Sequence, residues 1–142
     1  MKPAVEKIVG FFETLAPQSV ERFGEFYTEE AFFKDPFNEV RGLDEVQRIF
    51  QHMFVALQEP RFVITARVVE GDQCFLSWDF RFRFKRFHPE VTQTIRGATH
   101  LRLAPDGRIR FHRDYWDAAE ELYEKLPVVG GLMRWLKKRA NS

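Results

Sequence analysis

The sequence predicts an α+β fold in which helices come first and a meander of long strands follows. Apolar residues recur at helical spacing in three stretches before Pro60, which is the first observation behind this prediction. Beyond Pro60 apolar and polar residues alternate, as they do in strands with one buried face. The length of 142 residues suits one core, so residues 1–142 are interpreted as a single domain.

Three helices are expected in the first part of the chain. Residues 3–16 form the first, because their apolar residues share one helical face and Pro17 stops the pattern. Ser19 can cap a second, short helix with an apolar side that extends to Tyr27. The third helix follows Gly42 and presents a long apolar stripe. That stripe consists of Val46, Ile49, Phe50, Met53, Phe54 and Leu57.

Four strands are expected after the helices. They are residues 61–70, 74–87, 91–103 and 108–117. The second strand has one apolar face, formed by Leu76, Trp78, Phe80, Phe82 and Phe84. This face is too long and too apolar to lie against water, and the three helices are the elements available to cover it. The sheet is therefore expected to curl around an interior pocket that the helices close.

The same alternation divides the last strand into two faces. One face carries His112, Asp114 and Trp116, and the other carries Ile109, Phe111 and Tyr115. Apolar residues on both sides of one strand need two partners. These partners are expected to be the pocket wall and, most simply, a second copy of the chain.

The run 32-FFKDPF-37 places a carboxylate among apolar side chains. Desolvation by the phenylalanines would disfavour the charged form of Asp35, which raises its proton affinity toward the range useful for a general base. A structural alternative stays open. An aspartate before Pro36 can begin a turn in which its carboxylate accepts hydrogen bonds from nearby backbone amides.

The composition limits the classes of function. The 22 basic and 21 acidic side chains leave a formal charge of +1, so no strong field recommends nucleic acid as a partner. Sixteen Phe, three Trp and three Tyr favour either an aromatic-lined pocket for an apolar small molecule or a large apolar interface. Cys74 is the one cysteine and the histidines lack metal-site spacing, so neither a disulfide nor a metal centre is expected. The N-terminus lacks the continuous apolar segment of a signal peptide, and a cytoplasmic location is expected.

The C-terminal segment, residues 118–142, is expected to be a helical extension with a break at 127-PVVGG-131. Beyond the break, basic residues stand beside Trp135 and leucines. This pattern suits either packing over the pocket mouth or docking on a membrane surface. The restarted helix is only about two turns long, which favours packing over a membrane role.

Three runs carry a resemblance to a known family. They are 27-YTEEAFFKDPF-37, 41-RGLDEVQRIF-50 and 107-GRIRFHRDYWD-117. Over almost the whole chain the sequence resembles the nuclear transport factor 2-like superfamily, in its branch of ketosteroid isomerases and SnoaL-like polyketide cyclases. The resemblance implies a cone, in which a curved, mostly antiparallel sheet is wrapped by three N-terminal helices around a pocket. The superfamily contains isomerases, dehydratases, cyclases and proteins without catalysis, so the resemblance specifies the fold better than the chemistry.

The resemblance also assigns candidate site residues. The aspartate of the family's D-P motif, which shuttles a proton between carbons in ketosteroid isomerases, corresponds to Asp35. The two donors that those isomerases use for the enolate oxygen correspond to Phe11 and Thr99. Phe11 cannot donate a hydrogen bond, and Thr99 is a weak neutral donor. This departure argues against a ketosteroid isomerase itself.

Under the same resemblance, His112 and Asp114 face the pocket opposite Asp35. An imidazole with two carboxylates is a workable acid/base set for removing a proton and expelling hydroxide, as dehydratases of the superfamily do. A purely structural pair of His112 and Asp114 is the alternative. The other residues expected on the pocket wall are Phe11, Tyr27, Phe50, Phe54, Trp78, Phe80, Thr99 and Trp116.

The resulting hypothesis is a cofactor-independent isomerase, dehydratase or cyclase that acts on a small apolar or polycyclic molecule by proton transfer. The alternative is a non-catalytic small-molecule-binding or scaffold domain of the same fold. No cofactor is implied in either case. Relatives of this fold commonly dimerise through the outer face of the sheet, so a homodimer is expected.

Overall fold

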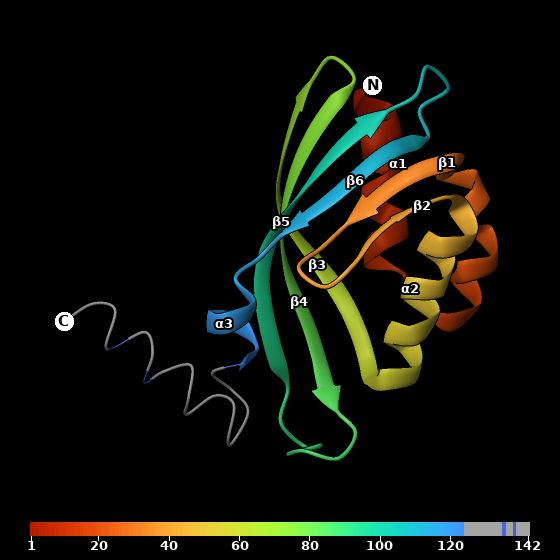
Figure 1. Ribbon diagram of the computed structural model, residues 1–142. Helices are drawn as coiled ribbons and strands as arrows, with labels where there is room; N and C mark the ends of the chain where they lie inside the picture. The colour runs from red at the N-terminus through yellow and green to blue at the C-terminus, as the bar shows by residue number, and fades with distance from the viewer. Residues whose placement is uncertain (124–134, 136–137, 139–142) are drawn as a thin grey trace.

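A six-stranded curved sheet forms the centre of the molecule (Figure 1). The computed structural model describes residues 1–123, 135 and 138. The strands are β1 (Tyr27–Lys34), β2 (Glu39–Arg41), β3 (Leu57–Glu70), β4 (Gln73–Phe84), β5 (Gln93–Leu103) and β6 (Ile109–Tyr115). Their order in the sheet is β2-β1-β6-β5-β4-β3. Only β1 and β6 pair in parallel, so the sheet is mostly antiparallel, as predicted.

Helices cover the concave face of this sheet (Figure 1). They are α1 (Lys2–Glu13), η1 (Pro17–Glu25), which is a 3₁₀ helix, and α2 (Leu43–Ala56). The three predicted N-terminal helices are thus present, but the third ends at Ala56, and Leu57 and Pro60, which the prediction places at its end, belong to β3. In η1 the Ser19 hydroxyl accepts a hydrogen bond from the backbone N–H of Ala16 at 3.0 Å, so Ser19 lies inside the first turn and closes it from there.

The core lies between these helices and the sheet. Val5, Ile8, Phe12, Val46 and Phe50 point from α1 and α2 onto the inner face of the strands, where they are buried. On β4 the predicted alternation is confirmed, because Leu76, Trp78, Phe80 and Phe82 are buried while the residues between them are more exposed. Burial of this long apolar stripe is what holds the helices against the sheet.

Two irregularities bend the edge strand β3. Its register with β4 shifts between Gln58 and Arg61 and again between Ile64 and Ala66. Such bulges increase the local twist and bend a strand, which curls the sheet toward the helices. At the second bulge the Glu13 carboxylate, at the end of α1, accepts a hydrogen bond from the backbone N–H of Ile64 at 3.1 Å. This bond ties α1 to the curved edge.

Residues 27–34 differ from the prediction. The apolar spacing assigns Tyr27 to a helix, but it begins the strand β1, which pairs with β6 in parallel. The burial along β1 does not alternate cleanly, and the register with β6 shifts between Tyr27 and Phe32. A strand with this irregularity lacks the period of two by which sequence patterns reveal strands.

A bulge also corrects the two faces expected for β6. Ile109 is fully buried on the inner face, whereas strict alternation places it on the outer face with Phe111. Leu103 pairs with Ile109 and Arg102 with Phe111, so Arg110 is the extra residue. One inserted residue reverses the direction of the side chains that precede it.

The C-terminal extension is described only at its beginning. A short helix, α3 (Ala118–Glu121), follows β6, and the Asp117 side chain caps it by accepting a hydrogen bond from the backbone N–H of Glu120. The predicted break at 127–131 and the helix expected after it lie outside the described residues, apart from 135 and 138. Among the described helices, none has both the length and the apolar character needed to cross a membrane.

Candidate functional site

The sheet and α2 enclose a cavity of about 390 Å³. Aromatic side chains make up most of its wall, including Phe33, Phe50, Phe62, Trp78, Phe80 and Phe82. Four polar side chains reach the cavity: Asp114 from β6, Asp35 and Asn38 from the turn between β1 and β2, and His52 from α2. This combination of an apolar body and a few polar groups is typical of a small-molecule site.

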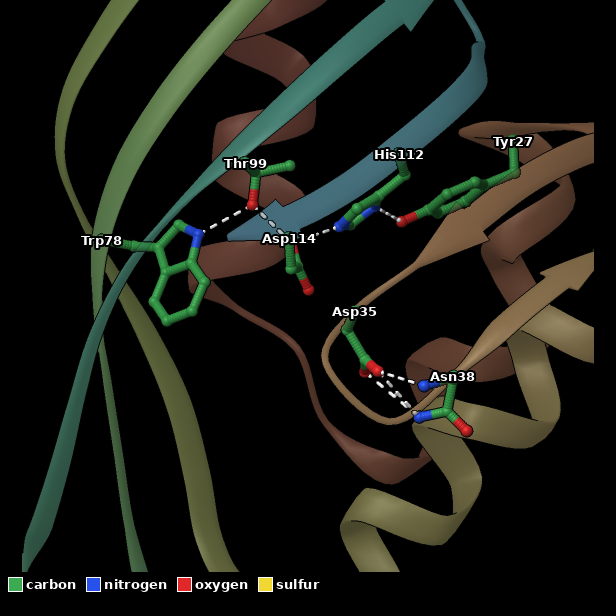
Figure 2. Close-up of polar contacts among 7 residues, drawn as sticks. All are labelled: Tyr27, Asp35, Asn38, Trp78, Thr99, His112 and Asp114. Carbon is green, nitrogen blue, oxygen red and sulfur yellow. Dashed lines mark hydrogen bonds and ion pairs between the residues drawn. The ribbon is translucent and has the colours of Figure 1, made fainter. Parts of the chain in front are cut away.

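A string of five hydrogen-bonded side chains crosses the inner face of the sheet (Figure 2). The hydroxyl of Tyr27 lies 2.7 Å from Nδ1 of His112, and Nε2 of His112 lies 2.7 Å from Oδ1 of Asp114. The hydroxyl of Thr99 lies 2.6 Å from the same carboxylate oxygen. Nε1 of Trp78 donates to the Thr99 hydroxyl at 2.7 Å.

The direction of each proton in this string follows from its ends. The Trp78 indole can only donate, so the Thr99 hydroxyl accepts that bond and donates its own proton to Asp114. The carboxylate oxygen then receives the Nε2 proton of His112. With Nε2 protonated, Nδ1 of a neutral imidazole accepts the Tyr27 hydroxyl proton. This arrangement gives every proton an acceptor, whereas a doubly protonated imidazole would leave the Tyr27 proton without one.

Tyr27 is completely buried at the far end of the string. Burial raises the pKa of Tyr27 well above its usual value, and the negative charge of Asp114 raises this pKa further. The phenol therefore stays protonated and serves His112 as a permanent donor.

Strand register explains how these residues meet. On β6, residues two positions apart share a face, which puts His112 and Asp114 side by side. Thr99 is paired directly with Asp114 across β5 and β6. Trp78 is paired with Gly97, and a Cβ atom at Gly97 would lie 2.5 Å from the indole ring. The missing side chain of Gly97 therefore lets Trp78 lie flat across β5 and reach Thr99.

Two members of the string, Trp78 and Asp114, line the large cavity, and the ionisable one is Asp114. Its side chain is 14% exposed. Oδ1 is occupied by Thr99 and His112, while Oδ2 has no hydrogen-bond partner in the described part of the chain. The string thus engages one oxygen of the carboxylate and leaves the other without a partner in the described part of the chain, on a side chain that lines the cavity.

Asp35 is held differently. Its Oδ1 accepts hydrogen bonds from the backbone N–H groups of Phe37 at 2.8 Å and Asn38 at 2.7 Å. The Asn38 side-chain amide donates to both carboxylate oxygens, at 3.1 and 3.2 Å (Figure 2). These bonds are those of the turn that the sequence analysis leaves open as the alternative to a catalytic role. Asp35 lines the cavity, yet its carboxylate organises the turn between β1 and β2. This turn stands at the mouth of the cavity and is called the mouth turn below.

The predicted site residues fall into three groups. Asp35, Phe50, Trp78, Phe80, Asp114 and Trp116 line the large cavity. Thr99 and His112 line a much smaller pocket of about 20 Å³, to whose wall Phe50, Trp78 and Asp114 also contribute. Phe11, Tyr27 and Phe54 line neither of the two.

Physical reasons explain why the three residues of the third group line neither pocket. Phe11 stacks on Phe26 with ring centroids 3.9 Å apart, so it packs between α1 and η1. Tyr27 lies behind His112, because its strand turns the phenol into the core. Phe54 is partly buried against the core on another side of α2. Helical spacing identifies the apolar side of a helix but does not say which residues on it meet a cavity.

Several residues of the mouth are absent from the sequence prediction. Phe37, Asn38 and His52 line the cavity there. The Phe37 ring contacts Trp116 edge to face, with centroids 5.6 Å apart. A signal for His52 exists, because it stands one helical turn after Ile49, which also lines the cavity. Phe37 and Asn38 reach the cavity because of the turn geometry that Asp35 sets. A turn carries no periodic signal in the sequence.

Comparison with known families matches a family model described as the SnoaL-like domain to residues 8–112. Comparison with curated proteins gives no match. The matched segment contains the second half of α1, the mouth turn, α2 and nearly the whole sheet up to His112.

Solved structures with the same fold are similar to this chain at low sequence identity. A putative SnoaL-like polyketide cyclase from Shewanella putrefaciens is 18% identical, with a TM-score of 0.69 over 86% of this chain and 97% of that one. A hypothetical protein with a ketosteroid isomerase-like fold from Catenulispora acidiphila, in complex with trimethylamine, is 15% identical, with a TM-score of 0.70 over 84% and 88%. TerC co-crystallised with polyporic acid is 14% identical, with a TM-score of 0.70 over 83% and 94%. At these identities the likeness shows the fold.

Proposed function

Because the chain belongs to the SnoaL-like domain family, we propose that it is a cofactor-independent acid–base enzyme of the isomerase, dehydratase or cyclase type, with Asp114 as its general base. The substrate is a small apolar or polycyclic molecule held in the aromatic cavity. The observation that carries this proposal is the carboxylate of Asp114, with one oxygen held by Thr99 and His112 and the other open to the cavity.

The geometry supports a base in two ways. Two hydrogen bonds on Oδ1 fix the orientation of the Asp114 carboxylate, so that Oδ2 is aimed before any substrate arrives. The apolar wall excludes water from the other sides, which strengthens the interaction between the carboxylate and an acidic proton of the substrate.

The proposed reaction balances its protons without any further reagent. Oδ2 takes a proton from a C–H or O–H group of the substrate, and Asp114 becomes a neutral carboxylic acid. In an isomerisation the same oxygen returns the proton to a second carbon, whereas in a dehydration the proton leaves with the expelled hydroxide as water. Oδ1 keeps its two hydrogen bonds throughout.

His112 acts through Asp114 in this proposal. Its ring lies in the smaller pocket and is 4% exposed, and both ring nitrogens are engaged. It is therefore a positioning residue, and Asp35, which the turn occupies, shapes the mouth. Of the three acid–base candidates, Asp114 alone presents an oxygen without a partner among the described residues.

The similar structures agree with a small organic ligand in general terms. One of them is in complex with trimethylamine and another was co-crystallised with polyporic acid. These ligands belong to those proteins, and they support the use of the same fold as a container for small molecules.

Deuterium exchange tests the proposal without knowledge of the natural substrate. The probe is 2-tetralone, an apolar bicyclic ketone with acidic C–H bonds beside the carbonyl, incubated with the protein in D₂O and followed by proton NMR. The intact chain is expected to accelerate exchange at those carbons. In Asp114→Asn the acceleration should fall by at least ~100-fold, the usual contribution of a general base.

Two controls make this result specific. Asp35→Asn keeps an acceptor oxygen in the mouth turn and should leave the exchange rate nearly unchanged. Quenching of tryptophan fluorescence by 2-tetralone should be similar in Asp114→Asn and the intact chain, because the cavity shape is kept. Equal exchange rates in Asp114→Asn and the intact chain would overturn the assignment of the base.

Binding without chemistry is the second candidate, and one observation favours it. An enolate needs hydrogen-bond donors for its oxygen, but Phe11 has none and Thr99 donates to Asp114. Among the described lining residues, the side-chain N–H groups that have no hydrogen-bond partner in the described part of the chain belong to His52 and Trp116. Ligand binding with no exchange in the intact chain would select this candidate.

Assembly as a homodimer is the remaining part of the proposal. The outer face of the sheet carries an aromatic strip in which Phe75 stacks on His100 at 4.3 Å and Phe111 stacks on Phe32 at 5.3 Å. Phe75 is 49% exposed, which supports a covering partner. Light scattering at micromolar concentration should give the mass of a dimer, and Phe75→Glu should shift it to a monomer. A monomeric mass of the unchanged chain would contradict this.

A further inference from the structure

Asp114 forms no ion pair with a Lys or Arg side chain in the described part of the chain, and its one basic partner is His112, whose Nε2 lies 2.7 Å from Oδ1. Its two hydrogen-bond donors are the Thr99 hydroxyl and the His112 imidazole, and the proton arrangement inferred above for the string gives that imidazole one ring proton. The next residue, Arg113, points to the opposite face of the sheet, where its guanidinium lies 4.6 Å from the centroid of the Tyr115 ring. A carboxylate that is 14% exposed and has no Lys or Arg partner is unusual, because buried charges are normally compensated.

The rest of the cavity adds to this negative field. Asp35 is a second carboxylate on its wall, and no Lys or Arg is among the described residues that line it. His52, the one basic side chain present, stands exposed at the mouth. The other walls are largely aromatic, and the faces of aromatic rings attract cations.

We propose that the cavity binds an apolar molecule that carries a basic nitrogen, taken up as a cation whose N–H group donates to Oδ2 of Asp114. The ammonium group compensates the carboxylate, and the apolar part of the ligand fills the aromatic wall. A carboxylate or phosphate ligand in this cavity would bring a second negative charge against Asp114 with no Lys or Arg among the described wall residues to offset it, so the cavity disfavours such ligands. This inference rests on the cavity and the carboxylate of the proposed function, but it concerns binding and needs no turnover.

Three matched probes of one shape test the charge preference. They are 2-naphthylmethylamine, which is a cation at pH 7, 2-naphthylmethanol, which is neutral, and 2-naphthoate, which is an anion. Binding is followed by tryptophan fluorescence, since Trp78 and Trp116 both line the cavity. The amine should bind about tenfold or more tightly than the alcohol, as expected for one charged hydrogen bond, and the naphthoate should bind weakest.

Substitutions locate the preference at Asp114. In Asp114→Asn the affinity for the amine should fall to that for the alcohol, while the affinity for the alcohol stays nearly constant. Asp79→Asn is the matched control, because it removes one negative charge from the outer face of the sheet, where Asp79 pairs with Arg81. That variant should keep the full preference for the amine.

A second variant keeps the test decisive if Asp114→Asn fails to fold. Met53→Lys introduces a cation on the α2 side of the cavity, and its long stem can keep the charged end near the mouth. It should reverse the order, so that naphthoate binds more tightly than the amine. Equal binding of the three probes by the intact chain, or a preference for naphthoate, overturns the inference. Deuterium exchange of 2-tetralone would then still decide the proposed function by itself.

Discussion

Two aspartates meet the same cavity, and the structure uses them in opposite ways. Asp35 stands in the mouth turn, where four hydrogen bonds from the turn and from Asn38 occupy its carboxylate. Asp114 stands on the sheet, where two donors occupy one of its oxygens and leave the other open. A carboxylate surrounded by donors on its own turn builds local structure, whereas one held at a single oxygen by neighbouring strands is prepared to accept a proton.

The difference comes from the elements that carry the two residues. A turn supplies backbone N–H groups that have no partner in a ladder, and an aspartate two or three residues before them captures them. A strand interior has its backbone groups already paired, so Asp114 receives its bonds from the side chains Thr99 and His112. The number of unused acceptor sites then follows from the local fold rather than from the residue type.

Among the predicted changes, removal of His112 should lower the free energy of unfolding the most. His112→Phe keeps the ring shape but leaves the buried Tyr27 hydroxyl without an acceptor and Asp114 without one donor. The free energy of unfolding should fall by ~2–4 kcal/mol, because two buried polar groups lose a partner. Chemical denaturation measures this loss. His52→Phe, at the exposed mouth position on α2, is the control and should cost less than ~0.5 kcal/mol.

A second change should break the string at its other end. Gly97→Ala places a methyl group within 2.5 Å of the Trp78 ring, which must move and lose its bond to Thr99. Overpacking of this kind costs ~1–3 kcal/mol and should shift the tryptophan emission spectrum. At Gly10 in α1 a methyl group meets nothing within 4 Å, so Gly10→Ala should raise stability by up to ~1 kcal/mol. Equal stability of both variants would show that Trp78 does not need the space at Gly97.

Alkaline pH should lower the stability of the protein through ionisable groups in its interior and not through the residues at the cavity mouth. Burial raises the pKa of Cys74 from 9.0 to about 11, and burial raises the pKa of Tyr27 well above its usual value. In the unfolded chain both groups lose their protons at lower pH than in the folded protein, so stability is complete below pH 9 and falls as pH rises above it.

Thermal melting between pH 7 and 10.5 measures that slope. The melting temperature should fall by a few degrees over the upper part of this range. Tyr27→Phe should flatten the part above pH 10, and Cys74→Ala should flatten the part between pH 9 and 10. A slope that both variants retain would assign the alkaline loss to other groups.

The sequence predicts which side chains share a face at the site, but it does not predict the hydrogen bonds among them. Alternation on β6 puts His112 and Asp114 on one face, and the family resemblance implies that this face meets the pocket; in the structure both residues line the small inner pocket. The partners follow from strand order and register, because Thr99 pairs with Asp114 across two strands and Tyr27 arrives on a strand placed next to β6. No periodicity within one segment reports which segments become neighbours.

Irregular backbone explains the other differences. The bulge at Arg110 turns Ile109 inward, and the shifted register of β1 hides a strand behind an apparently helical pattern. The bulge in β6 adds one residue relative to β5, and β1 gains three residues relative to β6 between Tyr27 and Phe32. An odd number of extra residues reverses a face without changing composition. The mouth turn was open to either interpretation of Asp35, since a D-P pair suits a turn and a base alike.

The smallest effect is expected at the mouth, and it separates the two aspartates most directly. Asp35→Ala removes the acceptor for the N–H groups of Phe37 and Asn38, which lie near solvent and can bond to water instead. The free energy of unfolding should therefore fall by only ~1 kcal/mol, and Asp35→Asn should cost less because its carbonyl oxygen still accepts. Release of the turn should also loosen the contact between Phe37 and Trp116, so ligand should dissociate faster from Asp35→Ala than from Asp35→Asn. Stopped-flow tryptophan fluorescence with 2-tetralone measures that rate. If Asp35→Asn abolished deuterium exchange as completely as Asp114→Asn, the four bonds of the turn would not prevent Asp35 from acting as a base, and unused acceptor sites would no longer distinguish the two residues.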